Sequence, residues 1–155
     1  MADPTVRDVM STKVVTLRPD QTVPEAADVL AADKIGAAPV VDTHGKLVGL
    51  LLDEDLIVSE ARLHVPTAIS FLGAEFVLPS ENRRFEDELK KAAGANVEDI
   101  MTTEFPTVGP DDTIEKIATL MHDHDANHVP VVDADGNLVG IVARGDLVRH
   151  LAATT

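Results

Sequence analysis

The chain has 155 residues, of which 45% are apolar, and its mean hydropathy of +0.06 is typical of a folded domain that buries a core of its own. Its 13 basic and 27 acidic residues give a formal net charge of −14, which disfavours nucleic acid and anionic lipid surfaces as partners. The absence of cysteine excludes disulfides, a thiol nucleophile and a cysteine-ligated metal. No apolar run is long enough to span a bilayer and the N-terminus lacks the layout of a secretory signal, so we expect a cytoplasmic protein without a membrane partner.

The chain contains an internal repeat. Residues 6–57 align with residues 97–148 without a gap and at a constant offset of 91 residues, and roughly 19 of about 52 aligned positions are identical. A unit that is too small to bury its own apolar face is stabilised by packing on a second copy, so we expect one pseudo-symmetric domain with a shared interface. The expected boundaries are a single module over residues 1–155, repeat 1 at residues 6–65, an inter-repeat insert at residues 66–96 and repeat 2 at residues 97–152.

Each repeat begins with a short amphipathic turn that ends at Met10 or Met101. A β-branched run follows, at residues 14–17 and 106–108, and predicts a short strand that Pro19 or Pro110 closes. A helix is predicted next, because a threonine at the cap position precedes apolar residues at helical spacing. The expected core-facing residues are Val23, Ala26, Ala27 and Leu30 after Thr22, and Ile114, Ile117, Ala118 and Met121 after Thr113.

A β-hairpin is predicted in the second half of each repeat. The motif Pro-Val-Val-Asp, a turn that contains glycine and an apolar run that begins with Leu-Val-Gly occur in both copies. A closing helix begins beyond the hairpin, near Asp53 in repeat 1 and near Gly145 in repeat 2. Each repeat is therefore expected to be β-α-β-β-α, and the fold class is α+β. The expected hairpin strands are residues 39–41 and 47–52 in repeat 1 and residues 130–132 and 138–142 in repeat 2, with Gly45 and Gly136 in the turns.

The insert between the repeats breaks the internal symmetry. It is apolar at residues 68–78 and helix-like at residues 84–93, and it holds three of the four phenylalanines, Phe71, Phe76 and Phe85. One interpretation is a satellite cluster that packs on the domain's own surface. The other is a dimer contact, since aromatic residues are enriched in interfaces.

The repeated motif resembles a known family. Pro-Val-Val-Asp, a turn, Leu-Val-Gly and Asp-Leu, preceded by Val-x-Asp-(Val or Ile)-Met, are similar to the cystathionine β-synthase (CBS) domain. The whole chain resembles a stand-alone tandem pair of such domains, a Bateman module. This resemblance implies two β-α-β-β-α repeats packed sheet against sheet, a regulatory role, no obligatory cofactor, and assembly into a homodimer. It also implies an adenosyl ligand such as AMP, ADP, ATP or S-adenosylmethionine.

The resemblance further implies two clefts, each with an adenine-facing wall from one repeat and a ribose-binding aspartate from the other. An aspartate in the first turn of a helix can accept both ribose hydroxyl protons, and apolar side chains can hold the base. We name the clefts after these aspartates. The residues implied for the Asp146 cleft are Ser11, Thr16, Ile35, Gly36, Ile141, Ala143 and Asp146, and those implied for the Asp55 cleft are Thr102, Thr107, Ala126, Asn127, Leu50, Leu52 and Asp55.

The two clefts are expected to differ in charge. Arg144 lies in the same turn as Asp146 and can pair with a phosphate, whereas Asp53 and Glu54 stand beside Asp55 and would repel one. We therefore expect the Asp146 cleft to bind a phosphorylated ligand first. The sequence leaves open a second role for both aspartates, which is to cap or favour the N-terminus of the closing helix.

Histidines gather in the sequence MHDHDANHVP. His124 and His128 have the i, i+4 spacing of a helical metal site, but the helix is expected to end before Asn127, so we interpret these histidines as solvated residues at a helix end rather than as a metal centre. The resemblance gives His128 a further role, since the family often carries a basic residue at this position near the ligand phosphate.

Two classes of function follow. The chain has neither a glycine-rich phosphate loop nor a nucleophile elbow, so we expect a protein that is not an enzyme. The first interpretation is a sensor that binds an adenosyl nucleotide and signals in trans to an unknown protein partner or a second copy. The alternative is a ligand-independent scaffold with degenerated clefts, which is favoured by Leu52 and Ala143 where the family usually has serine or threonine. A third interpretation uses the histidines in a metal-dependent stress protein.

Overall fold

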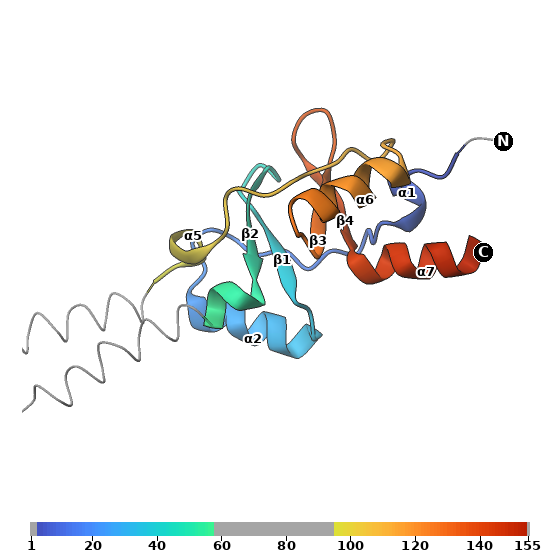
Figure 1. Cartoon of the computed structure of the whole chain (residues 1–155). Coiled ribbons are helices and arrows are strands. Elements are labelled where there is room, and N and C mark those ends of the chain that lie inside the picture. The colour runs from blue at the N-terminus through green and yellow to red at the C-terminus, as the bar shows by residue number, and fades with distance from the viewer. Residues whose placement is uncertain (1–2, 58–94, 155) are drawn as a thin grey trace, which may run out of the picture.

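The computed structural model describes residues 3–57 and 95–154 (Figure 1). The insert's phenylalanines and its expected helix lie outside the described residues. Both repeats follow the same order of elements, and none of the helices in the described part of the chain is long and apolar enough to cross a membrane. The elements are α1 (Val6–Val9), α2 (Val23–Asp33), β1 (Ala37–Val41), β2 (Leu47–Leu52), α5 (Val97–Ile100), α6 (Ile114–Asp123), β3 (His128–Val132), β4 (Leu138–Ala143) and α7 (Arg144–Thr154), and residues 53–57 are also helical.

The two predicted hairpins form with matching registers. β1 pairs antiparallel with β2, and β3 pairs antiparallel with β4, and each pair has a register shift next to its turn, between Val40 and Val41 or between Val131 and Val132. Each turn contains a glycine in the left-handed region, with φ of 80° at Gly45 and 86° at Gly136. The prediction of an α+β fold built from two pseudo-symmetric repeats is confirmed.

The first strand of each repeat is shorter than predicted. Leu17 makes a single parallel bridge to Val40, with its N–H 2.9 Å from the Pro39 carbonyl and its own carbonyl 2.9 Å from the Val41 N–H. The chain then turns at once, because the Arg18 N–H donates to the Gln21 side chain instead of to the sheet. The equivalent bridge in repeat 2 joins Val108 to Val131, and there the next N–H donates to a side chain as well.

Both main helices begin at their predicted caps. The Thr22 hydroxyl accepts from the Glu25 N–H at 3.3 Å, and the Thr113 hydroxyl accepts from the Lys116 N–H at 3.0 Å. One predicted core residue is wrong, because Ala118 is exposed. The buried stripe of α6 instead contains Leu120 as a partly buried residue, three positions after the fully buried Ile117.

The short helices α1 and α5 are exchanged between the repeats. Val6 of α1 is completely buried in the core of repeat 2, and Val97 of α5 is completely buried in the core of repeat 1. Backbone hydrogen bonds fix both exchanges, since Val6 N–H donates to the Asp112 carbonyl and Val97 N–H to the Gln21 carbonyl, each at 2.8 Å. Figure 1 shows α1 beside α6 and α7, and α5 beside β2 at the other end of the molecule. Each core is therefore completed by the other repeat.

The chain that leaves each exchanged helix crosses the hairpin of the other repeat. Ser11 forms an antiparallel bridge with Ile141 on β4, and Thr102 forms the equivalent bridge with Leu50 on β2. The hairpin turns also meet, because the Leu47 N–H donates to the Gly136 carbonyl and the Leu138 N–H donates to the Gly45 carbonyl, each at 3.3 Å. These contacts place residues of both repeats around each cleft.

The segment that contains Met10 and Ser11 passes so close to β4 that adding a single methyl group at Gly140 is expected to lower stability. A Cβ atom at Gly140 would lie 2.7 Å from the Met10 sulfur and 3.0 Å from the Ser11 carbonyl oxygen. We expect Gly140→Ala to lower the free energy of unfolding by about 1–3 kcal/mol, measured by urea denaturation. Gly109→Ala is the control, because the nearest atom there would be the Asp112 carboxylate at 3.6 Å. Equal stability of the two variants would contradict the close approach.

Candidate functional site

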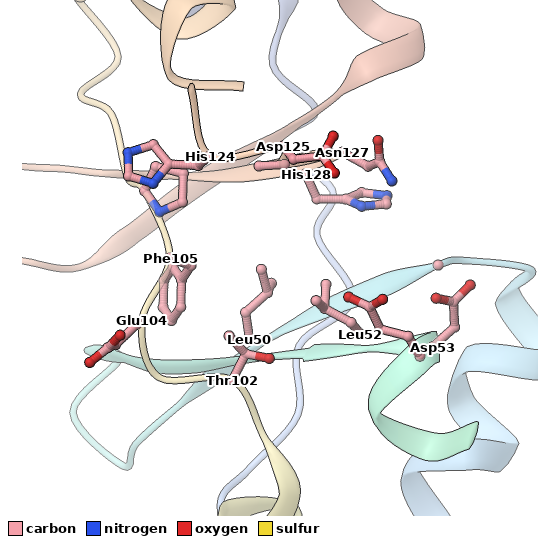
Figure 2. A pocket seen from close by; sticks show the side chains of 14 residues that line it. Leu50, Leu52, Asp53, Thr102, Glu104, Phe105, His124, Asp125, Asn127 and His128 are labelled. Atoms are coloured by element: carbon pink, nitrogen blue, oxygen red, sulfur yellow. The ribbon is translucent and has the colours of Figure 1, made fainter. Parts of the chain in front are cut away.

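The Asp55 cleft is a cavity of about 370 Å³ between the repeats. Figure 2 shows Leu50, Leu52 and Asp53 on one side and His124 and His128 on the other, with the ring of Phe105 between the two walls. The lining thus combines an apolar floor on β2 with ionisable groups at the rim. It consists of Gly36, Leu50, Leu52, Asp53, Glu54, Thr102, Glu104, Phe105, Pro106, His124, Asp125, Ala126, Asn127 and His128.

The Asp146 cleft is a cavity of about 310 Å³ related to the first by the internal repeat. Its walls come from the segment after α1, the end of α2 and the end of β4, so it too is built by both repeats. Its lining consists of Ser11, Lys13, Val14, Val15, Lys34, Ile35, Gly36, Ala37, His128, Ile141, Ala143 and Asp146.

Both named aspartates lie in the first turn of a closing helix and cap its start. Asp55 accepts a hydrogen bond from the Leu52 N–H at 2.9 Å, and Asp146 accepts one from the Ala143 N–H at 2.8 Å. Asp55 also accepts from the Thr102 hydroxyl at 3.1 Å, whereas Asp146 pairs with Arg149. Capping fixes each carboxylate at the start of its helix while leaving lone pairs for a ligand hydroxyl. The two roles that the sequence left open are therefore compatible in geometry.

Most of the residues implied for the two clefts come together. The lining of the Asp146 cleft includes Ser11, Ile35, Gly36, Ile141, Ala143 and Asp146, and that of the Asp55 cleft includes Leu50, Leu52, Thr102, Ala126 and Asn127. Asp55 itself is outside the lining, because its carboxylate turns to Thr102 and the helix start.

Two further implied residues, Thr16 and Thr107, lie away from their clefts. Thr16 lines a separate hollow with Arg18. Neighbouring side chains of an extended chain point in opposite directions, and Leu17, between the two, is buried in the core, so Thr16 and Arg18 point away from it. Thr107, which precedes the buried Val108 in the same way, is exposed and lines neither cleft.

Arg144 also lies outside both linings. Its guanidinium is 3.9 Å from the Asp125 carboxylate, and its side chain is 55% exposed. Arg144 therefore does not line the Asp146 cleft in this structure, and its pairing with a ligand phosphate stays a prediction. Lys13 and Lys34 line that cleft instead. Lys34 is the left-handed cap residue that ends α2, with φ of 52°.

Sequence reasoning missed these lysines, although the repeat contains a signal for them. The residues that match Lys13 and Lys34 at the offset of 91 are Glu104 and Asp125, and both line the Asp55 cleft. Asp125 is left-handed too, with φ of 50°. A comparison of the two repeats for positions of opposite charge near the implied cleft residues would have identified these four residues.

His128 lines both clefts and has no counterpart in repeat 1, where Ala37 holds the matched position. A Cβ atom at Gly36 would lie 3.4 Å from both the His128 ring and the Asp53 carboxylate, so the imidazole sits close against this glycine. Burial lowers the pKa of His128, and the negative charges of Asp53 and Asp146 oppose that shift.

The histidine sequence does not form a helical pair. α6 ends at Asp123 with His124 as its cap residue, so His124 and His128 do not share a helix face. Among residues 3–57 and 95–154, no group of three or more histidines, aspartates or glutamates is placed to hold a metal ion.

The pKa of His128 predicts a pH dependence of stability. A histidine whose pKa is lower in the folded state binds its proton more weakly there, so it contributes stability above its unfolded pKa and loses it as the pH falls. We expect the drop in Tm between about pH 7 and about pH 5 to be smaller in His128→Gln than in the parent protein. His122→Gln, at an exposed position of α6, controls for the loss of a histidine in general. Parallel curves for the parent and His128→Gln would rule out this effect.

Comparison with known proteins places the chain among its relatives. The sequence model of the CBS domain matches residues 6–61 and 97–153. The uncharacterized protein MJ1426 of Methanocaldococcus jannaschii is 31% identical over 152 residues, which cover 94% of this chain and 90% of that protein.

Solved structures give the same result. CBSX2 of Arabidopsis thaliana in complex with AMP has a TM-score of 0.76 and 28% identity, with 97% of each chain covered. The CBS domain pair of MJ0100 in complex with 5′-methylthioadenosine and S-adenosylmethionine has a TM-score of 0.74 and 25% identity, with 99% of this chain and 100% of that chain covered. Two family matches, a gap-free internal repeat and a shared fold show that this chain belongs to the CBS domain family.

Proposed function

We propose that this protein is a regulatory module that binds an adenosyl nucleotide in the Asp146 cleft and signals in trans through a change in conformation or oligomeric state. AMP, ADP, ATP and S-adenosylmethionine are the candidate ligands. CBSX2 binds AMP, and the MJ0100 pair binds 5′-methylthioadenosine and S-adenosylmethionine, so adenosyl compounds are the first ligands to test. The proposal assigns no catalytic step to the chain.

The composition of the Asp146 cleft carries this proposal. Ile35 and Ile141 offer apolar surface to a base from opposite repeats, and Asp146 offers a carboxylate to ribose hydroxyls. Lys13 and Lys34 add positive charge at the same cavity, which suits a phosphate. A ligand held in this way would contact both repeats at once.

Such a ligand would signal by shifting a population. The ligand stabilises whichever arrangement of the two repeats it binds more tightly. The ratio of its affinities for the two arrangements limits how far it can shift the equilibrium between them. The exchange of α1 and α5 makes the repeats interdependent, so a shift at the cleft reaches both cores. The output then passes to a second copy or to a protein partner in the cytoplasm.

The closing helices are the proposed contact for a homodimer. Ile57 is 69% exposed and Val148 is 58% exposed, and the two residues occupy matched positions of the repeats. Because these exposed apolar residues lie at equivalent places on two helices, we interpret them as parts of a symmetric interface rather than as isolated apolar residues on the surface.

The scaffold alternative keeps one observation in its favour. Leu52 and Ala143 place apolar side chains in the linings where a hydroxyl would assist a ribose or a phosphate. A scaffold of this kind would bind its partner with the same affinity whether or not an adenosyl ligand is present.

The proposal predicts that AMP binding depends on Asp146. Asp146→Asn keeps an oxygen to cap α7 and removes the charge, so we expect at least about a tenfold loss of AMP affinity by calorimetric titration. Asp55→Asn is the matched control and should change AMP affinity by less than about twofold, because Asp55 does not line the Asp146 cleft. An AMP site that is sensitive to Asp55 alone would contradict the choice of cleft. No heat with any of the four candidate ligands would favour the scaffold.

The dimer has its own test. Val148→Glu places a charge on the exposed face of α7, and we expect it to weaken self-association at least about tenfold, measured by sedimentation equilibrium. Ala118→Glu, on the exposed side of α6, is the control. A parent protein that stays monomeric at every concentration, or a Val148→Glu protein that associates as the parent does, would refute this interface.

A further inference from the structure

The two clefts carry opposite charges at matched positions. Lys13 of the Asp146 cleft matches Glu104 of the Asp55 cleft, and Lys34 matches Asp125. All four residues line a cavity, and each pair is separated by the repeat offset of 91 residues. The rim of one cleft is therefore basic where the rim of the other is acidic.

The first residues of the two closing helices increase the difference in charge between the clefts. Asp53 and Glu54 line the Asp55 cleft, whereas the matched residues, Arg144 and Gly145, add no acidic group to the Asp146 cleft. The lining of the Asp55 cleft thus has four carboxylates, one of which, Asp125, lies 3.9 Å from the Arg144 guanidinium, together with two histidines. The lining of the Asp146 cleft has one carboxylate, two lysines and one histidine.

The two lysines differ from others on the surface. The Lys46 ammonium donates to the Asp135 carbonyl, and the Lys116 ammonium is 3.1 Å from the Asp112 carboxylate. Within residues 3–57 and 95–154, neither the Lys13 nor the Lys34 ammonium has an ion-pair or hydrogen-bond partner. In a chain of net charge −14, two uncompensated cations at one cavity suit an anionic ligand.

We propose that the two clefts sort adenosyl ligands by charge: Lys13 and Lys34 select a phosphorylated ligand in the Asp146 cleft, and Glu104 and Asp125 restrict the Asp55 cleft to adenosyl ligands without phosphate. This inference rests on the proposed function, and it names the side chains that set the specificity of each cleft.

The physical basis is the sign of the charge that a phosphate meets. A phosphate that enters the Asp55 cleft would be brought close to like charges, and the repulsion between them is strongest at low salt, where screening is weak. The apolar part of that cleft, Leu50 and Phe105, remains suitable for a base. The electrostatic repulsion therefore acts on the phosphate of the ligand and does not prevent the adenosyl group from binding.

The experiment exchanges the charges between the clefts. One double variant, Lys13→Glu with Lys34→Asp, places the residues of repeat 2 in the Asp146 cleft. The other, Glu104→Lys with Asp125→Lys, makes the reverse change. The swap at positions 34 and 125 respects their left-handed backbone, because each residue type already occupies that conformation in this chain. The probes are AMP and 5′-methylthioadenosine, which has no phosphate, in calorimetric titrations at low and high salt.

Charge sorting predicts different results for the two probes. The parent should bind AMP at one site, and Lys13→Glu with Lys34→Asp should lose at least about tenfold in AMP affinity, while its affinity for 5′-methylthioadenosine changes by less than about twofold. Glu104→Lys with Asp125→Lys should gain a second AMP site. The AMP difference between parent and variants should shrink at high salt, since these side chains lie at the surface.

Failure of the sorting differs from failure of the proposed function. If 5′-methylthioadenosine binds but AMP affinity is the same in the parent and in Lys13→Glu with Lys34→Asp, the role of the lysines is overturned. If Glu104→Lys with Asp125→Lys gains no second AMP site, the role of the acidic pair is overturned. If neither probe binds the folded parent, as judged from its intact melting transition, the proposed function itself fails.

Discussion

The exchange of α1 and α5 is the constraint on which the rest of the structure depends. Val6 and Val97 are fully buried, and each lies in the core of the repeat to which it does not belong. Removing either valine from its site would leave a cavity under a hairpin, so neither repeat has a complete core when it is alone. The backbone that leads out of each exchanged helix must then cross the opposite hairpin, which it does through the bridges of Ser11 with Ile141 and Thr102 with Leu50. The clefts lie beside those crossings.

Because the crossings come in a matched pair, the chain builds two cavities on one framework. The framework is symmetric where packing and backbone geometry decide, as in the glycine turns and the register shifts of the hairpins. It is asymmetric at the rims, where exposed side chains carry charge. His128 is a further asymmetry, since its imidazole borders both cavities and the matched position, Ala37, has only a methyl group. Two cavities that share a wall are a route by which occupancy of one can affect the other.

Much of this fold could be predicted because repeats, caps and hairpin turns leave local signals in a sequence. Thr22 and Thr113 begin helices, and Gly45 and Gly136 occupy the left-handed turns, as expected. The exchange of the short helices could not be predicted, because an apolar pattern indicates that a residue is buried but not which of two similar cores contains it. The position of Arg144 in the helix turn could be predicted from the sequence, but the direction of its side chain toward Asp125 could not. Lys13 and Lys34 were predictable in principle by comparing the repeats for charge rather than for identity.

The separation of framework from rim explains how a duplicated site can acquire two specificities at little cost in stability. A change at a buried crossing, such as the glycine that faces Met10 and Ser11, disturbs packing that both repeats share. A change of charge at an exposed rim residue typically alters stability by no more than about 0.5 kcal/mol, because water solvates either sign. The same change alters the potential inside a partly enclosed cavity, where a ligand phosphate is less well solvated. Rim positions such as 34 and 125 are therefore where ligand choice can diverge while the fold stays fixed.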